Sequence, residues 1–379
     1  MKTSIIHYND TYLNLSETFI YNYIRHIEKY NVLVIANKVD NMDLFPYDQV
    51  YCFENQPKQS AVSLISNIKR IWFRRILFGK YCVQIIKNNN ARLVHAHFGP
   101  RGYEMLQVKK STGLPLITTF YGQDMSQFPR KKEWLNKYRS LFEEGDLFLT
   151  EGNCMKKGLC ALGCPEEKIR IQRIAINVDK YNFRLRQNKK SGEKVVLFFC
   201  GRFVEKKGLL YALEAVNRVY RTFPDIEFRI VGDGEQRKDV ENMIQENKMY
   251  SYVKLLGMQP HEKVLQEMDR ADVFLQPSVT AANGDSEGGA PTTVLEAQAC
   301  GVPVIATFHA DIPEVVVDGE SALLSRERDV PGLTSNILKL LTGDCSWTEM
   351  GRAGRSFIEK NHDIKQNVHK LEELYSSCL

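Results

Sequence analysis

Two carboxylates and a run of backbone amides share one short segment of this chain. The stretch DSEGGAPTTVLEAQACGVPVIAT (285–307) predicts a loop, a helix and a strand. Pro291 suits the first helical position, and Gly301 suits the position just past the helix end. The loop therefore leads into a helix N-terminus, where unpaired N–H groups and a partial positive charge favour a phosphate group.

The acids of this segment need a different partner, because a carboxylate beside a phosphate is repulsive. Glu287 falls in the loop and Glu296 in the second helical turn. Hydroxyl groups of a sugar or a ribose are suitable donors for both carboxylates. A solvated loop acid and a surface helix residue are the alternatives, and composition does not decide between the two interpretations.

A second group of candidate residues is cationic. The segment CGRFVEKKGL predicts a strand that ends at Gly201 and Arg202, followed by a turn with Lys206 and Lys207. Open α/β sheets bind ligands at the carboxyl ends of their strands. Arg202 can grip a phosphate bidentately, and Lys207 can act as a point charge. A solvated cluster is the alternative, and it applies more strongly to Lys206.

The N-terminal half also places polar residues beside predicted strand ends. In LNLSETFIYNYIRHI, Ser16 is a suitable N-cap and Glu17 falls in the first helical turn. His95 and His97 share one face of a strand in VHAHFG, and His97 lies at its exit. Asp124 follows the next strand in YGQD. A structural histidine and an Asx turn are the alternatives for the last two positions.

Short apolar runs alternate with amphipathic segments almost throughout, which predicts two doubly wound parallel sheets. The runs are 31–37, 91–98, 114–122, 146–152, 194–202, 226–234, 252–258, 271–278 and 302–308. The polar stretch 184–194 predicts a domain boundary. We therefore expect domains at 1–183 and 195–355 and a helical segment at 356–379.

Bulk composition excludes several classes of protein. A formal charge of +5 over 379 residues is too small an excess to indicate nucleic-acid binding. Nine cysteines without a paired C-x-x-C spacing indicate free thiols, with no metal site expected. Gly232 and Gly234 are followed by Arg237 where a dinucleotide motif needs a third glycine, which argues against a nicotinamide oxidoreductase. Without a signal peptide or an apolar run of bilayer length, we expect a cytoplasmic protein.

Several motifs together resemble the retaining glycosyltransferases of family 4, in particular those that build bacterial capsule, exopolysaccharide and lipopolysaccharide chains. These motifs are EGGAPTTVLEAQACGVPVIAT, GRFVEKKGL, IVGDGE, LSETFI and HAHFG, in the family's order. The resemblance implies the GT-B fold, with two Rossmann-like domains facing a cleft and a C-terminal helix that packs back toward the N-terminal domain. It further implies a nucleotide-sugar donor on the C-terminal domain, a saccharide or lipid-linked saccharide acceptor on the other, and no metal or other cofactor.

The resemblance also assigns roles to individual residues. Arg202 and Lys207 would contact the donor diphosphate, and Glu287 the hydroxyls of the donor sugar, with His97 as a further catalytic residue. Glu296 would contact the ribose. Further donor-binding positions are Ser16, Glu17, Gly201, Gly232, Gly288, Gly289, Ala290, Pro291 and Thr292. Tyr121 and Asp124 belong to the acceptor side or to the cleft.

This sequence departs from the family pattern at two places. Glu287 and Glu296 are separated by eight residues where the family has seven, so a glycine of 288–289 must bulge out for Glu287 to keep its role. If it does not, Glu287 loses its assigned role. In the T-x-H-G-x-D pattern, Tyr121 replaces the histidine, which weakens any claim that this position grips the donor.

Preorganised positive charge would stabilise the departing nucleoside diphosphate without reorganisation. Arg202, Lys207 and the amides beside Pro291 are the candidates for this role. An epimerase or a phosphorylase on the same architecture is one alternative. A catalytically silent protein that binds nucleotide-sugar in an assembly complex is another.

The segment NIKRIWFRRILFGKYCVQIIK (67–87) is basic and aromatic, with a helical period. A domain helix that buries its apolar side is the ordinary interpretation. Since the acceptor can be lipid-linked, we expect instead reversible binding to an anionic membrane at its cytoplasmic face. Trp72 and Phe78 are expected to insert shallowly.

Overall fold

The chain forms two compact units in the computed structural model, which describes residues 2–15, 17–54, 67–190 and 192–379, without the side chains of 67–72. The first unit comprises Met1–Glu151, Lys156–Ala175 and Ile364–Leu379, and the second comprises Gly152–Met155 and Ile176–Asp363. Each unit has its own parallel sheet, as the apolar runs predict.

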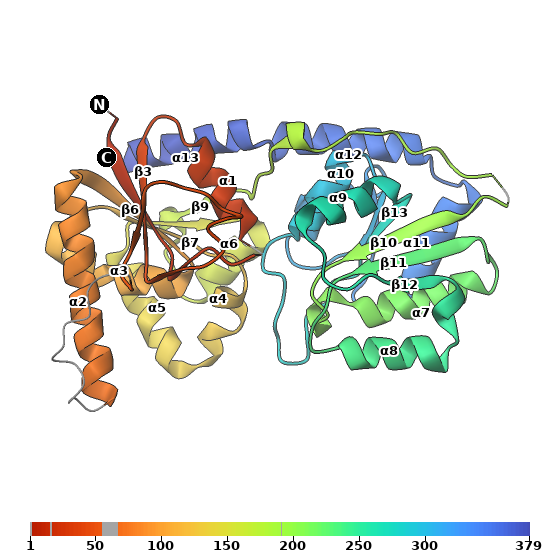
Figure 1. The fold of residues 1–379 in the computed structure, drawn as a ribbon, viewed down its shortest axis with the longest axis horizontal. Helices are drawn as coiled ribbons and strands as arrows, with labels where there is room; N and C mark the ends of the chain where they lie inside the picture. Colours follow the sequence, from red (N-terminus) through yellow and green to blue (C-terminus); the bar gives the residue numbers. More distant parts are fainter. Residues whose placement is uncertain (1, 16, 55–66, 191) are drawn as a thin grey trace. The chain divides into compact units, whose positions relative to one another are not determined.

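The first unit is built on a seven-stranded parallel sheet in the order β5-β3-β1-β6-β7-β8-β9 (Figure 1). Its strands are β1 (Ser4–Tyr8), β3 (Asn31–Ala36), β5 (Val50–Cys52), β6 (Ala91–His97), β7 (Leu116–Thr119), β8 (Leu147–Thr150) and β9 (Ile169–Ile171). A two-stranded sheet of β2 (Thr11–Tyr12) and β4 (Lys38–Val39) lies beside it. The central strands are buried on both faces, which explains why they are continuous apolar runs.

Helices cover both faces of this sheet. The helices of the unit are α1 (Thr18–His26), α2 (Asn67–Asn88), α3 (Gly99–Thr112), α4 (Gln123–Ser126), α5 (Lys132–Glu144), α6 (Asn153–Ala161, shared with the second unit) and α13 (Ile364–Cys378), with 3-10 turns η2 (Phe128–Arg130) and η3 (Glu166–Lys168). α1 and α13 share one apolar core with alternate strand residues. The carboxylate of Glu372 accepts the backbone N–H groups of Glu28 and Lys29 at 2.8 and 2.7 Å. The expected return of the C-terminal helix to the N-terminal domain is therefore confirmed.

The second unit contains a six-stranded parallel sheet in the order β12-β11-β10-β13-β14-β15. Its strands are β10 (Val195–Cys200), β11 (Ile226–Val231), β12 (Val253–Leu255), β13 (Val273–Gln276), β14 (Val304–Thr307) and β15 (Ala322–Ser325). Its helices are α7 (Leu209–Tyr220), α8 (Arg237–Glu246), α9 (His261–Arg270), α10 (Thr292–Ala299), α11 (Val330–Thr342) and α12 (Trp347–Asn361), with 3-10 turns η4 (Val178–Lys180), η5 (Glu205–Lys207), η6 (Met249–Ser251) and η7 (Ile312–Glu314). α7, α8 and α11 share one core with alternate residues of the sheet. Each of the predicted runs in this half contains a strand.

The polar stretch expected as a domain boundary, 184–194, contains a buried arginine. Arg186 is 1% exposed, and its guanidinium donates to the carbonyls of Met268 and Asp269 at 3.0 Å and of Ala271 at 3.1 Å. These carbonyls belong to the end of α9, which has no further helical N–H groups to satisfy them. The stretch therefore packs onto the second unit, and the division between units falls at Ala175 and Ile176.

The helical segment expected at 356–379 spans parts of two helices. Its first part completes α12 in the second unit, and α13 belongs to the first unit. All nine cysteines are free, in agreement with the expected thiols. In the described part of the chain, no helix combines the length and apolar character needed to cross a bilayer.

Candidate functional site

Neighbouring strands of the second sheet deliver the predicted cation and acid to one place. Lys207 lies in η5, which follows β10, and Glu287 lies in the loop that follows the adjacent strand β13. The Lys207 Nζ is 2.9 Å from Glu287 Oε2, and these side chains are only 14% and 6% exposed. Ser278 Oγ donates to Glu287 Oε1 at 2.7 Å. The structure thus brings together two residues that are 80 positions apart.

The environment of Glu287 favours its charged form. Burial raises the pKa of this carboxyl, but the charges of Lys207 and Lys206 and the hydrogen bonds from Lys207 and Ser278 outweigh it, so that the pKa is lowered overall. Glu287 is therefore an ionised, oriented acceptor at neutral pH.

The register of the acidic loop is the one that places Glu287, and not Asp285, at Lys207. Asp285 pairs with Lys206, 3.1 Å from its Nζ, and Lys206 also donates to the carbonyl of Ser286 at 2.9 Å. Lys206 is only 6% exposed, so the expectation of a solvated lysine at this position is wrong. Directly after Glu287 the backbone of Gly288 has a φ of 78°, a left-handed conformation that glycine adopts without a Cβ penalty. The loop turns at this glycine.

Several amides beside the Lys207–Glu287 pair are available to an anion. The N–H groups of Gly288, Gly289, Ala290, Thr292 and Thr293 form no hydrogen bond with any described residue. They lead into α10, whose N-terminus carries a partial positive charge. The helix begins one residue later than expected, with Pro291 as N-cap in an extended conformation (φ −60°, ψ 131°). Proline's fixed φ suits this conformation as well as the first helical position.

Glu296 lies in the second turn of α10 and is only 6% exposed, so the surface alternative is wrong for this residue. Its Oε1 accepts hydrogen bonds from Tyr181 Oη at 3.2 Å and His261 Nε2 at 3.0 Å. The hydrogen bond with Glu296 raises the pKa of His261 against the opposing effect of burial. Oε2 of Glu296 forms no hydrogen bond within the described chain, which leaves it able to accept one from a ligand hydroxyl.

Arg202 and two glycines occupy the adjacent strand ends. Arg202 follows β10 and is exposed, and its guanidinium forms no ion pair with a described residue. Gly232 follows β11 with a φ of 144°, and a Cβ placed there would lie 1.9 Å from the carbonyl oxygen of Gly201. Gly232 therefore permits the close approach of two strand ends, and Arg202 lies directly after one of them.

His97 and Tyr121, two predicted site residues of the first unit, belong to a buried hydrogen-bond network. His97 Nε2 is 3.0 Å from His7 Nδ1, and His97 Nδ1 is 2.7 Å from the hydroxyl of Tyr121. The hydroxyl of Tyr375 in α13 is 2.6 Å from His95 Nδ1 and 3.1 Å from His7 Nε2. His97 is 2% exposed and both of its ring nitrogens are occupied. Any role that it has in binding therefore passes through Tyr121, which is half-buried.

Asp124 and Glu17 are bound to the local backbone and its neighbours. Asp124 accepts the N–H groups of Gly99, Tyr121 and Gly122 at 2.9, 3.1 and 2.8 Å. All three residues precede Asp124, whereas an Asx turn bonds the side chain to an N–H that follows it, so these bonds are not those of an Asx turn. Glu17 is the N-cap of α1 and does not lie in its first turn as expected, since the helix begins at Thr18.

The Glu17 carboxylate accepts the side chains of Asn9 and Asn14 at 3.0 and 2.8 Å and the N–H of Asn14 at 3.1 Å. These bonds hold the turn between β2 and α1. Ser16, the expected N-cap, lies outside the described residues.

His7, His95 and His97 form the metal-ligand-type cluster of the described chain, with ligand atoms within 4.8 Å of one another. Burial lowers the pKa of His7 to about 3 and the pKa of each of the other two well below its usual value, so all three imidazoles are neutral. Their ring nitrogens already bond to one another, to Tyr375 and Tyr121, and to Thr119. A metal ion would have to replace these bonds, so the cluster is best described as a hydrogen-bonded core.

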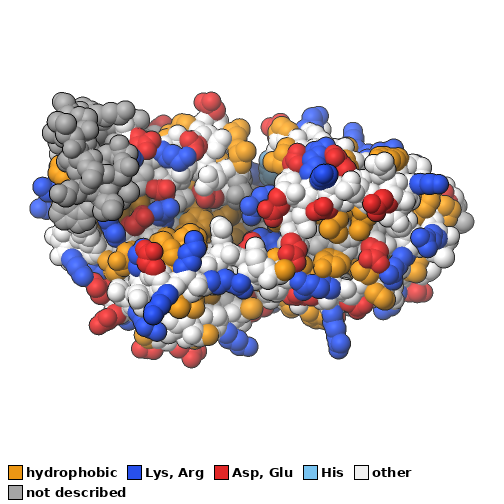
Figure 2. Space-filling view, turned by 90° about the horizontal axis from the view of Figure 1, so that it is seen from below, with side chains coloured by type: hydrophobic (Ala, Val, Ile, Leu, Met, Phe, Trp, Pro, Cys, Tyr) orange, Lys and Arg blue, Asp and Glu red, His pale blue; other side chains and the backbone are white. Residues whose placement is uncertain are grey.

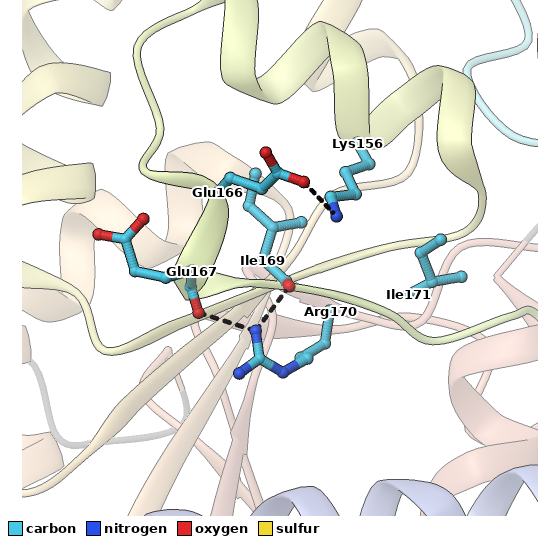
Figure 3. Close-up of a pocket in the computed structure, with 6 residues that line it drawn as sticks. All are labelled: Lys156, Glu166, Glu167, Ile169, Arg170 and Ile171. Carbon is cyan, nitrogen blue, oxygen red and sulfur yellow. Dashed lines mark hydrogen bonds and ion pairs between the residues drawn. The ribbon is translucent and has the colours of Figure 1, made fainter.

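A hollow of about 670 Å³ lies away from these residues, at the outer edge strand β9 of the first unit (Figure 3). Lys156 pairs with Glu166 at 2.8 Å, and Arg170 donates to the carbonyls of Glu167 and Ile169 at 2.7 and 2.9 Å. Figure 3 shows Lys156 and Glu166 pointing toward each other and the guanidinium of Arg170 beside the two carbonyl oxygens. These polar groups thus bond to one another or to backbone carbonyls, and the hollow is lined by no predicted site residue.

Four residues of the second-unit site were missed by sequence reasoning. Ser278 and His309 each lie two residues after an observed strand, β13 and β14, and His309 Nε2 accepts the N–H of Glu287 at 3.1 Å. The rule that ligands bind at the carboxyl ends of strands could have found both residues. Tyr181, directly after η4, and His261, the first residue of α9, both bond to Glu296. No local sequence pattern predicts that these two residues belong to the site.

Two Rossmann-like units, one of which presents cations, free amides and carboxylates suited to a nucleotide-sugar, define the GT-B class of transferases. The fold is shown over the full length by the crystal structure of Anabaena Alr3699/HepE in complex with UDP, with a TM-score of 0.78, 15% identity and coverage of 100% of both chains. Residues 16–180 match the model of Glycosyltransferase Family 4, and residues 181–357 match that of Glycosyl transferases group 1.

Two relatives are similar in sequence. The amylovoran biosynthesis glycosyltransferase AmsK of Erwinia amylovora is 32% identical over 73% of this chain and 68% of its own length. WcaL of Salmonella typhimurium, whose name refers to colanic acid biosynthesis, is 32% identical over 70% of this chain and 65% of its own length. The match thus spans about two thirds of each relative. The chain belongs to glycosyltransferase family 4, a retaining family.

Proposed function

We propose that this chain transfers a sugar from a nucleotide-sugar donor to a saccharide or lipid-linked saccharide acceptor, with retention of the anomeric configuration, in the assembly of a bacterial surface polysaccharide. The observation that carries the proposal is the buried Lys207–Glu287 pair beside a row of unpaired amides at the start of α10. The names of AmsK and WcaL, which refer to amylovoran and colanic acid biosynthesis, support the choice of pathway class.

The donor roles follow from which atoms are available. The amides of 288–290 and 292–293 are suited to the diphosphate because they supply unshared N–H groups. Arg202 and Lys207 add positive charge, although Lys207 also pairs with Glu287. Oε2 of Glu296 is suited to a ribose hydroxyl. The binding of UDP by a structural neighbour of the same fold supports a nucleoside diphosphate as the ligand.

The same residues would stabilise the transition state. As the bond between the sugar and the diphosphate breaks, negative charge grows on the leaving oxygen, and fixed cations and amides there stabilise it without reorganisation. The leaving oxygen can take the proton of the attacking acceptor hydroxyl. Glu287 is held by Ser278 and Lys207, so it is placed to orient the sugar hydroxyls and not to act as a covalent nucleophile.

On the first unit, we assign the acceptor side to Tyr121. Its hydroxyl is backed by His97 at 2.7 Å, and burial raises its pKa well above the usual value, so it stays a neutral donor and acceptor. Asp124 supports it through the N–H of Tyr121.

We propose a membrane contact that uses the basic side chains of α2 and not its aromatic ones. Phe78 is 7% exposed and its ring centroid lies 5.4 Å from those of Tyr8 and Phe53, so its expected insertion into lipid is wrong. Trp72 lies outside the described side chains. Arg74 and Arg75 are exposed on α2, although Arg74 pairs with Glu54 at 2.8 Å.

Basic and acidic side chains are interspersed on the face shown in Figure 2. The attraction to an anionic surface would therefore be electrostatic and local to α2.

The test of the proposed function is the turnover of a panel of UDP-glucose, UDP-galactose and GDP-mannose, measured as slow donor hydrolysis and as transfer to a lipid-linked saccharide. Glu287→Gln should reduce turnover with little change in nucleoside diphosphate affinity, whereas Glu296→Gln should weaken that affinity. Epimerised nucleotide-sugar would indicate an epimerase instead. Binding of a donor without any turnover would indicate a silent protein.

A further inference from the structure

The backbone of the acidic loop is held by a histidine that lies outside the predicted site. The N–H of Glu287 donates to His309 Nε2 at 3.1 Å. His309 follows β14, the strand adjacent to the one from which the loop departs, and its side chain is 1% exposed. Among the amides from Glu287 to Thr293, the N–H of Glu287 is thus bonded while its described neighbours at 288–290 are not.

The tautomer of His309 follows from these bonds. A backbone N–H can only donate, so Nε2 must be the acceptor and the ring proton must lie on Nδ1. Nδ1 in turn is 2.6 Å from Oε1 of Glu327, which follows β15. The same Glu327 carboxylate accepts the N–H and hydroxyl of Thr280, at the start of the acidic loop, at 2.9 and 3.2 Å. The Glu327 carboxylate therefore bonds both to the beginning of the acidic loop and to His309, which binds the backbone of Glu287.

The bond from the Glu287 N–H to His309 fixes the backbone of the longer acidic loop. With eight residues between Glu287 and Glu296 and a left-handed turn at Gly288, the position of the Glu287 carboxylate depends on where its own backbone is fixed. Lys207 and Ser278 hold the side-chain end, and His309 holds the main-chain end.

We infer that His309 is a positioning residue for transfer: in its Nδ1-protonated form, oriented by Glu327, it fixes the Glu287 backbone so that the carboxylate meets the donor sugar. The inference rests on the proposed role of Glu287. His309 is not expected to touch the donor, since both of its nitrogens are occupied within the protein.

Two substitutions separate the two ends of the imidazole. Gln places a polar atom near the position of Nε2, so His309→Gln keeps an acceptor for the Glu287 amide and loses the bond to Glu327. Asn places one near Nδ1, so His309→Asn keeps the donor to Glu327 and loses the bond to Glu287. Both variants remove the same ring from the same buried site, so each controls for the other's effect on folding, which circular dichroism and thermal melting would report.

The measurements are turnover with the active donor of the UDP-glucose, UDP-galactose and GDP-mannose panel, affinity for UDP and GDP, and hydrogen exchange of the Glu287 amide. His309→Asn should lower kcat roughly 10- to 100-fold, the range expected for a small displacement of a site group, with unchanged diphosphate affinity and faster amide exchange. His309→Gln should stay within about threefold of the parent. In a Glu287→Gln background, His309→Asn should cause no further loss, because its effect passes through that carboxylate.

Equal losses in both histidine variants, or a loss from His309→Asn that persists in full in the Glu287→Gln background, would overturn the inference. A harmless Glu287→Gln variant would instead refute the catalytic role proposed for that residue. In that case faster exchange confined to His309→Asn would still establish the backbone contact, so the two failures are distinguishable.

Discussion

Acid should destabilise the first unit through its three buried histidines. His7, His95 and His97 are at most 2% exposed, and burial lowers the pKa of each below its usual value of 6.5, to about 3 for His7. A base whose pKa is lowered by folding binds more protons in the unfolded chain than in the native one. Stability is therefore full above pH 6.5 and is lost as the pH falls below it, toward the native pKa.

The magnitude follows from the unfolded state. Between pH 7.5 and 5.5, an imidazole with an ordinary pKa takes up a proton in the unfolded chain. If the same imidazole stays neutral in the native state, this proton uptake lowers the free energy of unfolding by about 1.4 kcal/mol. Three such groups predict a loss of about 4 kcal/mol in the free energy of unfolding of the first unit. This is a large fraction of the stability of a domain.

Urea unfolding at the two pH values would measure this difference. Trp347 is the tryptophan of the second unit, so a Trp347→Phe background leaves fluorescence that reports the first unit alone. His7→Gln should lower stability at both pH values but reduce the difference between them by about 1.4 kcal/mol.

His369→Gln is the matched control, since this histidine is 73% exposed on α13. It should leave the difference nearly unchanged. A pH difference that is the same in the parent and in His7→Gln would refute the argument.

Three further outcomes are expected. Lys207→Ala and Arg202→Ala should each lower turnover by a factor of roughly 10²–10³. Only Lys207→Ala should also lower the free energy of unfolding, by about 3–5 kcal/mol, because it leaves Glu287 buried without its partner. Equal stability of the two variants in urea would contradict the stabilising role of the buried Lys207–Glu287 pair. Sedimentation with vesicles should show binding to anionic and not to neutral lipid, which falls with salt and with Arg74→Glu and Arg75→Glu together; equal recovery in the supernatant with both lipids at low salt would exclude the contact. Arg186→Met should lower the free energy of unfolding of the second unit by about 1–3 kcal/mol for each carbonyl left without a donor. An unchanged urea midpoint would contradict this expectation, because it would show that water replaces the guanidinium as hydrogen-bond donor to these carbonyls.

Much of the fold could be predicted because local patterns report it directly. Strands buried on both faces must be continuous apolar runs, and the segment from Asp285 to Thr307 contains its own helix start and stop signals. The same patterns could not locate β5, β9 or β15, which are short edge strands of three, three and four residues. They also placed a domain boundary at the polar stretch around Arg186, since a polar side chain that satisfies buried helix carbonyls looks the same in sequence as one in water.

The composition and motifs of the chain determined the class of the site: cations after one strand, and acids and glycines before a helix. Only the tertiary structure decided which of these groups meet. Lys206 and Lys207 are adjacent and chemically identical, yet one is paired with Asp285 and the other with Glu287. His309 and Glu327 become part of the site because β13, β14 and β15 are neighbours in the sheet. Strand order brings together residues tens of positions apart, and no periodicity within a single segment carries that information.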